Sequence, residues 1–405
     1  MLDVEEGGPV RITSMDTLQC DAGWRDFSFL KVTTDTGVVG WAEFTESHGN
    51  RGLAAAILAL GETLIGKDPR PVESISATLQ ALTRQVAGGM LTQAIAAIEN
   101  ALLDIKGKDL GVPVYELLGG PVRTSLPLYW SHCGSYRMSN PDVLGKPRPT
   151  GWDDVADLGR EARDAGYFGL KANILDFERS PEQIVMPGFT TSQGFPELNA
   201  DPRRIALLHR QINALREGAG PDLEIFLDLN FNFKTEGFLR IGRALEDTGL
   251  GWLELDSYDP EALATIRRGL RVPVASGESL HHRRQYLPFL QRQAFDVAIV
   301  DIVWNGLLES VKIASLADAF EVNVAPHNFY GHLASNMAAH FSAVVPNLRI
   351  MEIDVDDVPW RDDLVTNPPV IENGRFALPT GPGWGTDIDE DAVRAHPVTH
   401  RRAHS

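Results

Sequence analysis

Residues 224–230 read EIFLDLN, a short apolar run that closes on an acidic side chain, Asp228. The same pattern returns in WLELD, which carries Glu254, and in VPVASGE, which ends in Glu278. Short runs rich in Val, Ile and Leu predict buried strands, and the amphipathic, charged segments between them predict helices. Strands that alternate with helices in this way predict an α/β fold with a parallel sheet.

Eight such runs follow residue 125, and their alternation with helices favours a closed (β/α)-barrel over a sandwich. An open doubly wound sheet is the alternative, but no GxGxxG or P-loop sequence supports it. The eight predicted strands are LPLYWS (126–131), GLKAN (169–173), EIFLDLN (224–230), WLELD (252–256), VPVASGE (272–278), AIVDI (298–302), EVNVAPH (321–327) and RIMEI (349–353).

Six ionisable residues close successive runs at nearly constant spacing. They are Asp228, Glu254, Glu278, Asp301, His327 and Glu352, at intervals of 26, 24, 23, 26 and 25 residues. Each interval fits one strand–helix unit, so we expect the six side chains at the C-terminal ends of successive strands. Barrel enzymes carry their active sites on that face.

The first three of these residues favour a metal site. An isolated acidic residue at a strand end commonly caps the next helix, but three carboxylates in register repel one another unless a cation neutralises them. All-oxygen ligation by Asp228, Glu254 and Glu278 suits Mg²⁺, with Mn²⁺ as a substitute. Zinc would favour His or Cys, which are missing from these positions.

The first 125 residues predict a separate α+β unit. FSFLKVTT and GVVGWAEF flank a Gly-containing turn at 35–37, which predicts a β-hairpin, and apolar residues recur at helical spacing over 90–111. We therefore expect an N-terminal α+β domain at 1–125 and a barrel at 126–355. A loop-rich C-terminal segment at 356–405 is expected to pack back on the first domain.

Charge and composition exclude several classes of function. The 405 residues have a formal net charge of −18, which argues against nucleic-acid partners and against an anionic membrane surface. No run approaches about 18 uninterrupted apolar residues, and the N-terminus lacks the features of a signal peptide. Cys20 and Cys133 stand far apart, and two reduced thiols are typical of a cytoplasmic protein.

A set of short segments extends over nearly the whole chain: AAIENALLDIKGKDLGVPVYELLGG, GYFGLKAN, FLDLN, WLEL, ASGES, VDIVWNG, APHN and MEID. In this order and spacing they resemble the enolase superfamily, in the mandelate racemase branch of its mandelate racemase/muconate lactonizing enzyme family. The resemblance implies a modified TIM barrel with an N-terminal α+β capping domain. It also implies that Asp228, Glu254 and Glu278 bind Mg²⁺, and that a carboxylate substrate loses its α-proton to give a metal-stabilised enediolate.

His327 is the expected base. It follows Ala325-Pro326 at a strand end, and Asp301 ends the preceding strand. An Asp beside a His fixes the tautomer of the imidazole and raises its basicity, which is the arrangement of this branch.

The opposite face departs from the pattern of the branch, which places Lys-x-Lys at the end of the second barrel strand. The sequence has Lys171-Ala172-Asn173. Lys171 matches the first lysine, which in relatives often contacts the carboxylate or neighbouring groups. Asn173 replaces the second lysine, which often acts as a base, and an amide takes no proton at neutral pH. Since racemisation needs a base on each face, a one-base reaction fits better.

Several further side chains are candidates for binding substrate. Asn230 alternates to the same face as Asp228, and Glu352 closes the last strand of the series. The loops of the first domain are expected to cover the far end of the substrate, and the long segment 174–200 is of a kind that is more often functional than idle. The substrate-binding candidates are Asn230, Asn173, Glu352, Trp24, Arg25, His48 and His132.

These observations favour dehydration of a sugar acid, an aldonate or aldarate, to a 2-keto-3-deoxy acid. His327 would take the α-proton and, once protonated, help the β-hydroxyl leave, with Lys171 or a residue of the 174–200 loop as alternatives for the second task. The alternatives are a cycloisomerase or lactone-opening enzyme, which also needs one base, and a racemase or epimerase of a 2-hydroxy acid. A small carboxylate is the expected partner, and a homo-oligomer is expected by analogy with relatives.

Overall fold

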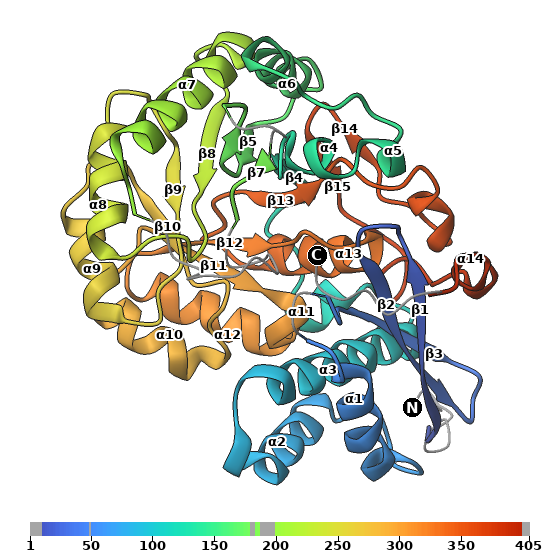
Figure 1. Ribbon diagram of the computed structural model, residues 1–405. Helices are drawn as coiled ribbons and strands as arrows, with labels where there is room; N and C mark the ends of the chain where they lie inside the picture. Colours follow the sequence, from blue (N-terminus) through green and yellow to red (C-terminus); the bar gives the residue numbers. More distant parts are fainter. Residues whose placement is uncertain (1–9, 48–49, 179–182, 187–198, 399–405) are drawn as a thin grey trace.

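The computed structural model describes residues 10–47, 50–178, 183–186 and 199–398, which form an N-terminal domain and a larger α/β domain (Figure 1). The N-terminal domain begins with an antiparallel sheet of order β1-β2-β3. Its strands are β1 (Ile12–Asp21), β2 (Asp26–Thr34) and β3 (Val39–Phe44), and its helices are α1 (Leu53–Gly61), α2 (Val72–Leu82) and α3 (Gly89–Leu110).

The predicted hairpin and helix of this domain are confirmed as β2–β3 and α3, but β1 was not expected. Only Ile12 and Cys20 of this strand have buried side chains. Its sequence, ITSMDTLQCD, therefore needs no regular alternation of apolar and polar residues, and it shows none. Partners that come later in the chain therefore decide this strand, and local pattern does not reveal it.

All eight predicted runs of the α/β domain form parallel strands. A ladder of hydrogen bonds joins the first seven in chain order, and the eighth pairs with the first. An isolated parallel bridge between Val324 and Leu348 links the seventh strand to the segment before the eighth, which completes the ring. The strands are β4 (Ser125–Ser131), β5 (Gly169–Ala172), β8 (Glu224–Asp228), β9 (Trp252–Glu254), β10 (Val274–Ser276), β11 (Val297–Asp301), β12 (Asn323–His327) and β13 (Met351–Asp354).

Helices cover the outside of this ring. Figure 1 shows them as an arc around the strands, and Asp201 and Asp259 cap the first turns of α7 and α9 through backbone N–H groups. The helices are α6 (Trp152–Asp164), α7 (Pro202–Ala219), α8 (Thr235–Ala244), α9 (Pro260–Arg268), α10 (His282–Gln291), α12 (Leu307–Asp318) and α13 (His332–Val344).

Shorter elements complete the described chain. The helices are α4 (Ser135–Ser139), α5 (Pro141–Leu144), α11 (Ile302–Asn305) and α14 (Glu390–Ala395), with single 3₁₀ turns at Glu62–Leu64, Arg84–Val86, Val114–Leu118 and Arg361–Leu364. The short strands are β6 (Leu175–Asp176), β7 (Gln183–Ile184), β14 (Ile371–Glu372) and β15 (Arg375–Ala377).

Aromatic side chains fill the interior of the strand ring below the C-terminal ends. The rings of Phe226 and Trp252 stack at 3.6 Å, and Tyr129 meets both edge-on. Lys171 lies above this layer, with its Nζ 5.6 Å from the centre of the Tyr129 ring. The middle of the ring is therefore a packed core, and the polar cluster around Lys171 lies at its C-terminal end.

Buried carboxylates of the N-terminal domain receive the first N–H groups of helices in the α/β domain. Glu43 of β3 accepts hydrogen bonds from Gly331 N at 2.6 Å and Ala334 N at 3.0 Å, at the start of α13. Glu99 of α3 accepts one from Leu308 N at 2.9 Å, at the start of α12. These contacts satisfy N–H groups that a helix cannot satisfy itself, so they hold the two domains in one orientation.

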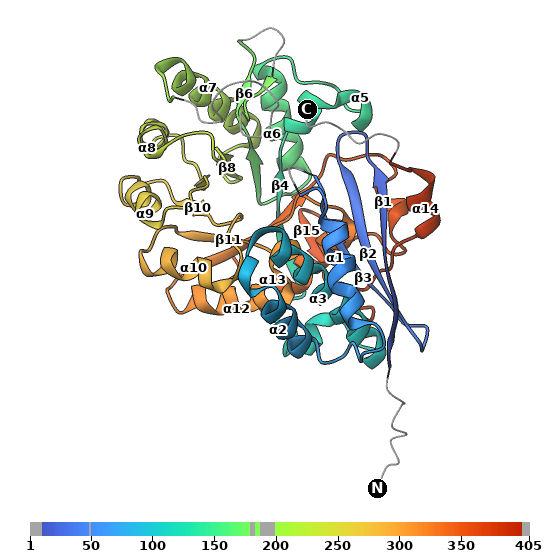
Figure 2. The same ribbon diagram turned by 60° about the horizontal axis from the view of Figure 1, so that its bottom comes forward.

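The C-terminal residues return to the N-terminal domain. Trp384 Nε1 donates to Trp41 O at 2.9 Å, and Asp104 accepts hydrogen bonds from the backbone N–H groups of both tryptophans. Helix α14 lies beside β1 in both views (Figures 1 and 2). This segment therefore fastens the N-terminal sheet to α3.

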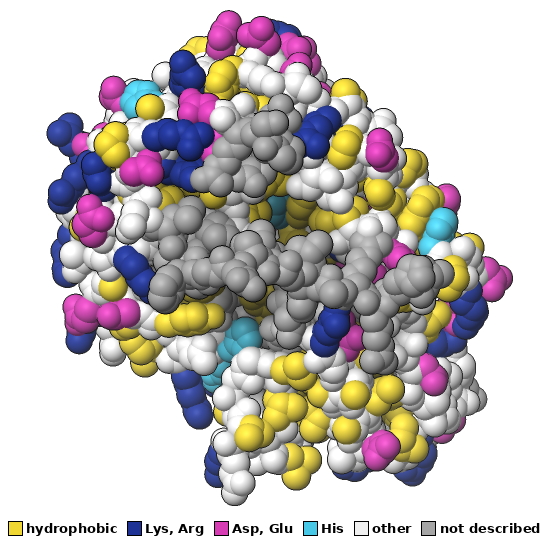
Figure 3. All heavy atoms as spheres, in the orientation of Figure 1, with side chains coloured by type: hydrophobic (Ala, Val, Ile, Leu, Met, Phe, Trp, Pro, Cys, Tyr) yellow, Lys and Arg dark blue, Asp and Glu magenta, His cyan; other side chains and the backbone are white. Residues whose placement is uncertain are grey.

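The outer surface is charged and mixed. Figure 3 shows acidic and basic side chains interspersed over the outer helices. Within the described ranges, no helix combines the length and apolar character needed to cross a membrane.

Replacing Glu43 with Ala is expected to lower the free energy of unfolding by about 1–3 kcal/mol, because two buried N–H groups lose their acceptor. Glu43→Gln keeps one acceptor oxygen and is expected to lose less. Urea unfolding of the two variants and the wild type measures this difference, and an unchanged stability of the Ala variant would contradict the role of Glu43 at the domain contact.

The same site predicts a pH dependence. Burial raises the pKa of Glu43 from 4.5 to about 7, above its value in the unfolded chain. The folded state therefore favours the protonated form, whose contribution is complete below pH 4.5 and is lost as the pH rises through about 7. As the pH rises from 4.5 to about 7, the free energy of unfolding of the wild type should fall relative to that of Glu43→Gln. A difference that stays constant over this range would contradict the raised pKa of Glu43.

Candidate functional site

The register of the parallel strands brings the predicted residues together. Asp228 at the end of β8 pairs with Glu254 at the end of β9, and Asp301 at the end of β11 pairs with His327 at the end of β12. Paired positions on neighbouring parallel strands lie side by side, about 4.8 Å apart. The constant spacing in the sequence therefore becomes a row of ionisable groups at one end of the ring.

Glu278 enters this row through a turn after β10. The strand ends at Ser276, and Gly277 takes a φ of 114°, which L side chains rarely adopt. A Cβ on Gly277 would also meet Tyr286 at 3.2 Å and the carbonyl of Ile299 at 3.3 Å. Glycine at this position lets the chain turn sharply enough for Glu278 to line the cavity.

His327 is held by a carboxylate at one nitrogen. Its Nδ1 lies 2.6 Å from Asp301 Oδ2, and that oxygen also accepts from the Tyr330 hydroxyl at 2.5 Å. The other nitrogen, Nε2, lies 3.4 Å from Glu278 Oε2. Burial alone would lower the pKa of His327, but the carboxylates of Glu278 and Asp301 raise it to about 10. A divalent cation beside Glu278 would offset part of this effect and bring the base closer to neutral pH.

Lys171 is the centre of a buried charge network. Its Nζ lies 2.8 Å from Glu254 Oε1 and 2.8 Å from Glu352 Oε1. Burial alone would lower the pKa of Lys171, but Glu254 and Glu352 raise it well above its usual value. The lysine is therefore a held ammonium ion.

Glu352 serves this network and does not line the cavity. Its second oxygen accepts from Asn328 N at 2.7 Å, and Ser131 Oγ donates to the first at 2.5 Å. Burial works against ionisation, but Lys171 and these hydrogen bonds hold the pKa of Glu352 below its usual range. Direct contact with substrate, the predicted role, is therefore less favoured than support of Lys171.

Four carboxylates crowd the strand ends: Asp228, Glu254 and Asp256, which are buried, and Glu278, which is partly exposed. Burial raises the pKa of each, and their mutual repulsion adds to the shift. Asp256 was not predicted, although it follows Glu254 by two positions and so returns to the same side of the strand. A cluster of like charges under apolar cover is a setting that a divalent cation stabilises.

The donor set fits Mg²⁺ by residue type, since it offers carboxylate oxygens from three neighbouring strands. In the part of the chain that the structure describes, no three acidic, His or Cys side chains converge closely enough to hold a metal as they stand. The Lys171 ammonium lies between Glu254 and, at 3.9 Å, Asp228 Oδ2. Side-chain rotation about these strand ends would therefore accompany metal binding.

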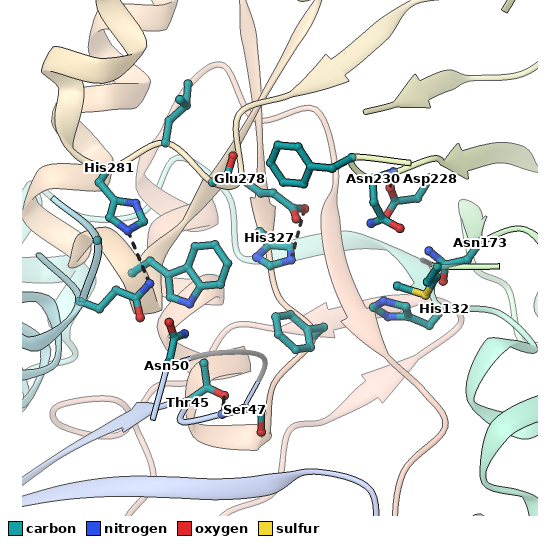
Figure 4. Close-up of a pocket in the computed structure, with 18 of the residues that line it drawn as sticks. Thr45, Ser47, Asn50, His132, Asn173, Asp228, Asn230, Glu278, His281 and His327 are labelled. Atoms are coloured by element: carbon teal, nitrogen blue, oxygen red, sulfur yellow. Dashed lines mark hydrogen bonds and ion pairs between the residues drawn. The ribbon is translucent and has the colours of Figure 1, made fainter. Parts of the chain in front are cut away.

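A cavity of about 910 Å³ opens over the strand ends, between the two domains (Figure 4). Its volume is at the upper end of the range for small-molecule sites. Residues of the N-terminal domain, among them Thr45, Ser47 and Asn50, form one wall. Eight of the predicted site residues line it: Trp24, His132, Lys171, Asn173, Asp228, Asn230, Glu278 and His327.

Part of the long segment after β5 contributes to this cavity. Ile184, the last residue of β7, and Met186 are lining residues, and β7 pairs antiparallel with β6. The segment's predicted importance therefore has a structural basis in its described residues. The predicted contact His48 lies outside the described part of the chain.

Arg25 has a different position from the one expected. It is 5% exposed and is not a lining residue, because its guanidinium pairs with Asp354 at 3.3 Å and with Asp357 and donates to Phe329 O. The structure favours a role for Arg25 in joining the domains over contact with substrate. From sequence alone, nothing distinguishes a buried Arg with acidic partners from an exposed one in the same loop.

Six buried polar atoms of lining residues lack a hydrogen-bond partner among the residues described. An unpaired buried polar atom costs about 1–3 kcal/mol, so a bound ligand or water is expected to pair with them. Both donors and acceptors are present, which suits hydroxyl groups because a hydroxyl can donate and accept. The atoms are Trp24 Nε1, Gln93 Oε1, Asn173 Nδ2, Asn230 Oδ1, His281 Nδ1 and Trp304 Nε1.

Sequence reasoning missed Gln93 and His281, which lie on α3 and just before α10. Their side chains approach at 3.5 Å across the two domains. Only the packing of α3 against the α/β domain brings them to one wall, and no motif or spacing in the sequence marks that contact.

Two family descriptions match the chain. "Mandelate racemase / muconate lactonizing enzyme, N-terminal domain" matches residues 7–119, and "Enolase C-terminal domain-like" matches residues 154–392. These matches confirm the resemblance seen in the sequence motifs and the fold expected from it.

Individual relatives match over most of their length. D-xylonate dehydratase of Haloferax volcanii is 28% identical over 96% of this chain and 89% of its own, and D-galactarolactone cycloisomerase of Agrobacterium fabrum is 30% identical over 90% and 89%. A crystal structure of a candidate L-alanine-DL-glutamate epimerase from Burkholderia xenovorans, bound to magnesium and fumarate, is 48% identical. The structural match covers 96% of this chain and 96% of that one, with a TM-score of 0.93.

Magnesium is expected to raise the melting temperature of the protein, and EDTA is expected to reverse the rise. At 100 times its dissociation constant, a ligand that binds only the folded state adds about 2.7 kcal/mol. Asp228→Asn should raise the melting temperature without metal, because it relieves repulsion among the carboxylates, and should remove most of the magnesium effect. Differential scanning calorimetry measures both.

Asp247→Asn is the matched control, since the Asp247 side chain is 79% exposed and pairs with His209 of the outer helix α7. It should keep the full magnesium effect. An equal rise in the Asp228 variant would contradict the assignment of Asp228 as a ligand.

Proposed function

Since the chain belongs to the enolase superfamily, in its mandelate racemase/muconate lactonizing enzyme family, we propose that it removes the proton α to the carboxylate of a sugar acid and eliminates the β-hydroxyl. The product is a 2-keto-3-deoxy acid. The observation that carries this proposal is the cavity itself, which combines a His–Asp pair with the six buried polar atoms that lack a hydrogen-bond partner among the described residues. The pair supplies a base, and the orphaned atoms suit a polyhydroxylated substrate.

The two faces of the site have different capacities for proton transfer. His327 offers a base whose tautomer is fixed by Asp301. On the opposite wall, Lys171 is held as an ammonium ion by two carboxylates, and Asn173 offers only an amide. Elimination needs one base, whereas epimerisation needs a base on each face, and neither Lys171 nor Asn173 supplies the second base, which supports elimination.

Asn173 is placed to bind and not to exchange protons. Its Oδ1 accepts from Ser135 Oγ at 3.0 Å, which fixes the amide and leaves Nδ2 as a donor toward the cavity. Asn230 has the opposite polarity, because its Oδ1 is the orphaned atom. Asn173 Nδ2 would therefore donate a hydrogen bond to a hydroxyl oxygen of the substrate, and Asn230 Oδ1 would accept one from a hydroxyl proton.

Asp228, Glu254 and Glu278 would hold Mg²⁺, which supplies compensation for the negative charge that builds up on the substrate carboxylate during proton removal. Lys171 adds a fixed positive charge to the same region. His327 takes the α-proton through Nε2 while Asp301 stabilises the resulting imidazolium. The apolar rings around His327, including Trp304 at 5.4 Å and Phe329 at 5.0 Å, limit access of water to the base.

Cycloisomerisation of a sugar-acid lactone is the second candidate function. The similarity to D-galactarolactone cycloisomerase, at 30% identity, favours it, and the reaction also needs a single base. The structural neighbour named for epimerisation of a dipeptide is a less suitable guide to activity, because that reaction requires the second base that Asn173 does not provide.

A library of aldonates and aldarates incubated with the protein and Mg²⁺ in D₂O tests the proposal. We expect at least one acid to give a 2-keto-3-deoxy product with deuterium at C3, observed by ¹H NMR. His327→Asn should reduce this turnover by about 10³-fold, in the range for loss of a general base.

His209→Asn is the matched control, since His209 lies on the outer helix α7 and pairs with Asp247. It should turn over at the wild-type rate. The lactones of the same acids are assayed in parallel, and their ring opening without loss of water would move the assignment to cycloisomerisation. Unchanged turnover by the His327 variant would contradict the one-base scheme.

A further inference from the structure

A second His–Asp pair lies in the cavity wall, across from the first. His132 Nδ1 lies 3.0 Å from Asp354 Oδ1, much as His327 Nδ1 lies beside Asp301. We propose that His132 is the general acid of the reaction and delivers a proton to the departing β-hydroxyl. This inference rests on the proposed dehydration and assigns its second proton transfer.

The structure fixes the orientation of His132. Nδ1 is within 3.0 Å of both Asp354 Oδ1 and Ser131 Oγ, and Ser131 donates its own proton to Glu352. The imidazole therefore keeps a proton on Nδ1, and any further proton resides on Nε2. Among the described residues nothing hydrogen-bonds to Nε2, and His132 is a lining residue of the cavity.

The carboxylate behind His132 is itself held in place. Asp354 is 1% exposed, and its second oxygen pairs with Arg25 Nη1 at 3.3 Å. The His132 ring stacks on Tyr136 with centroids 4.5 Å apart, and Trp24 also packs against Tyr136, at 4.1 Å. Arg25 and Trp24 belong to the N-terminal domain, so the packing of that domain positions this histidine.

The local backbone is also unusual. His132 has a φ of 50°, a left-handed conformation that costs a non-glycine residue energy. Surrounding contacts must hold such a residue, and residues of this kind concentrate at functional sites. The turn carries the chain from the end of β4 into α4 while the imidazole stays at the cavity.

One aromatic ring lies near both histidines. Phe329 lies 6.2 Å from the His132 ring and 5.0 Å from the His327 ring, so the imidazole centres are no farther apart than the sum of these distances. Figure 4 shows His132 beside Asn173 and His327 beside Glu278. A substrate bound over Phe329 would present its α-carbon to His327 and its β-hydroxyl to His132.

Other groups near the leaving hydroxyl are poorer acids. Lys171 is tied to Glu254 and Glu352 at 2.8 Å each, so loss of its proton would leave two buried carboxylates without a counterion. Asn173 has no proton to give. His327 becomes protonated during the reaction, but it lies on the face from which the α-proton departs.

Dehydration occurs in two steps and moves two protons. His327 Nε2 takes the proton from Cα, and the electron pair of that bond moves onto the substrate carboxylate to give an enediolate. The pair then returns to form the Cα=Cβ double bond as the Cβ–O bond breaks. The leaving oxygen takes the proton of His132 Nε2 and departs as water. The enol then tautomerises to the 2-keto acid, and exchange with solvent returns a proton to His132 and removes one from His327.

The test separates proton removal from elimination. Wild type, His132→Asn and His327→Asn are each incubated with Mg²⁺ and the aldonate and aldarate library in D₂O. For the acids that the wild type dehydrates, His132→Asn should lose about 10²–10⁴-fold in elimination, as expected for loss of a general acid. Exchange of the α-proton should persist within about threefold in this variant, whereas His327→Asn should lose both.

A leaving group that needs no proton supplies the matched control. The 3-deoxy-3-fluoro analogues of the same acids release fluoride, so His132→Asn should eliminate fluoride at close to the wild-type rate. This result also shows that the variant is folded. His132→Gln is the second variant, and its melting temperature should match that of the wild type.

Three outcomes would overturn the assignment. Wild-type dehydration by His132→Asn would exclude it as the acid, and loss of both exchange and fluoride release in a folded variant would place His132 in binding or proton removal. Absence of exchange and elimination by the wild type across the whole library would overturn the proposed dehydration and, with it, this inference.

Discussion

The parallel register between neighbouring strands is the constraint on which the rest of the site depends. It sets Asp228 against Glu254 and Asp301 against His327 without any contribution from the side chains themselves. Each pair is therefore created by backbone hydrogen bonds deep in the ring. The aromatic layer of Phe226, Trp252 and Tyr129 below them fills the middle of the ring, so that this polar cluster lies at the upper end.

This arrangement concentrates negative charge that the protein compensates only in part. Lys171 holds Glu254 and Glu352, and His327 faces Glu278, but Asp256 adds a fourth carboxylate to the cluster. A buried cluster of one sign is unfavourable by itself and becomes useful when a cation and an anionic substrate enter together. The stability of the apo protein and the chemistry of the site are thus two consequences of the same charge distribution.

Much of this organisation could be predicted from the sequence. The eight strands and the row from Asp228 to Glu352 follow from apolar runs and constant spacing, because a repeated βα unit places equivalent residues at equivalent heights. Strand β1 could not be found in this way, since few of its side chains are buried. The true setting of Arg25, the pair of His132 with Asp354, and the approach of Gln93 to His281 depend on contacts between domains, which no local pattern records.

The central claim is that strand register builds a divalent-cation site facing His327. Crystals soaked in Mn²⁺, with an anomalous difference map calculated near the manganese absorption edge, test it directly. We expect one dominant peak enclosed by Asp228, Glu254 and Glu278, on the cavity side of His327. A map without a peak among these three carboxylates, or with its dominant peak elsewhere on the protein, would contradict the claim.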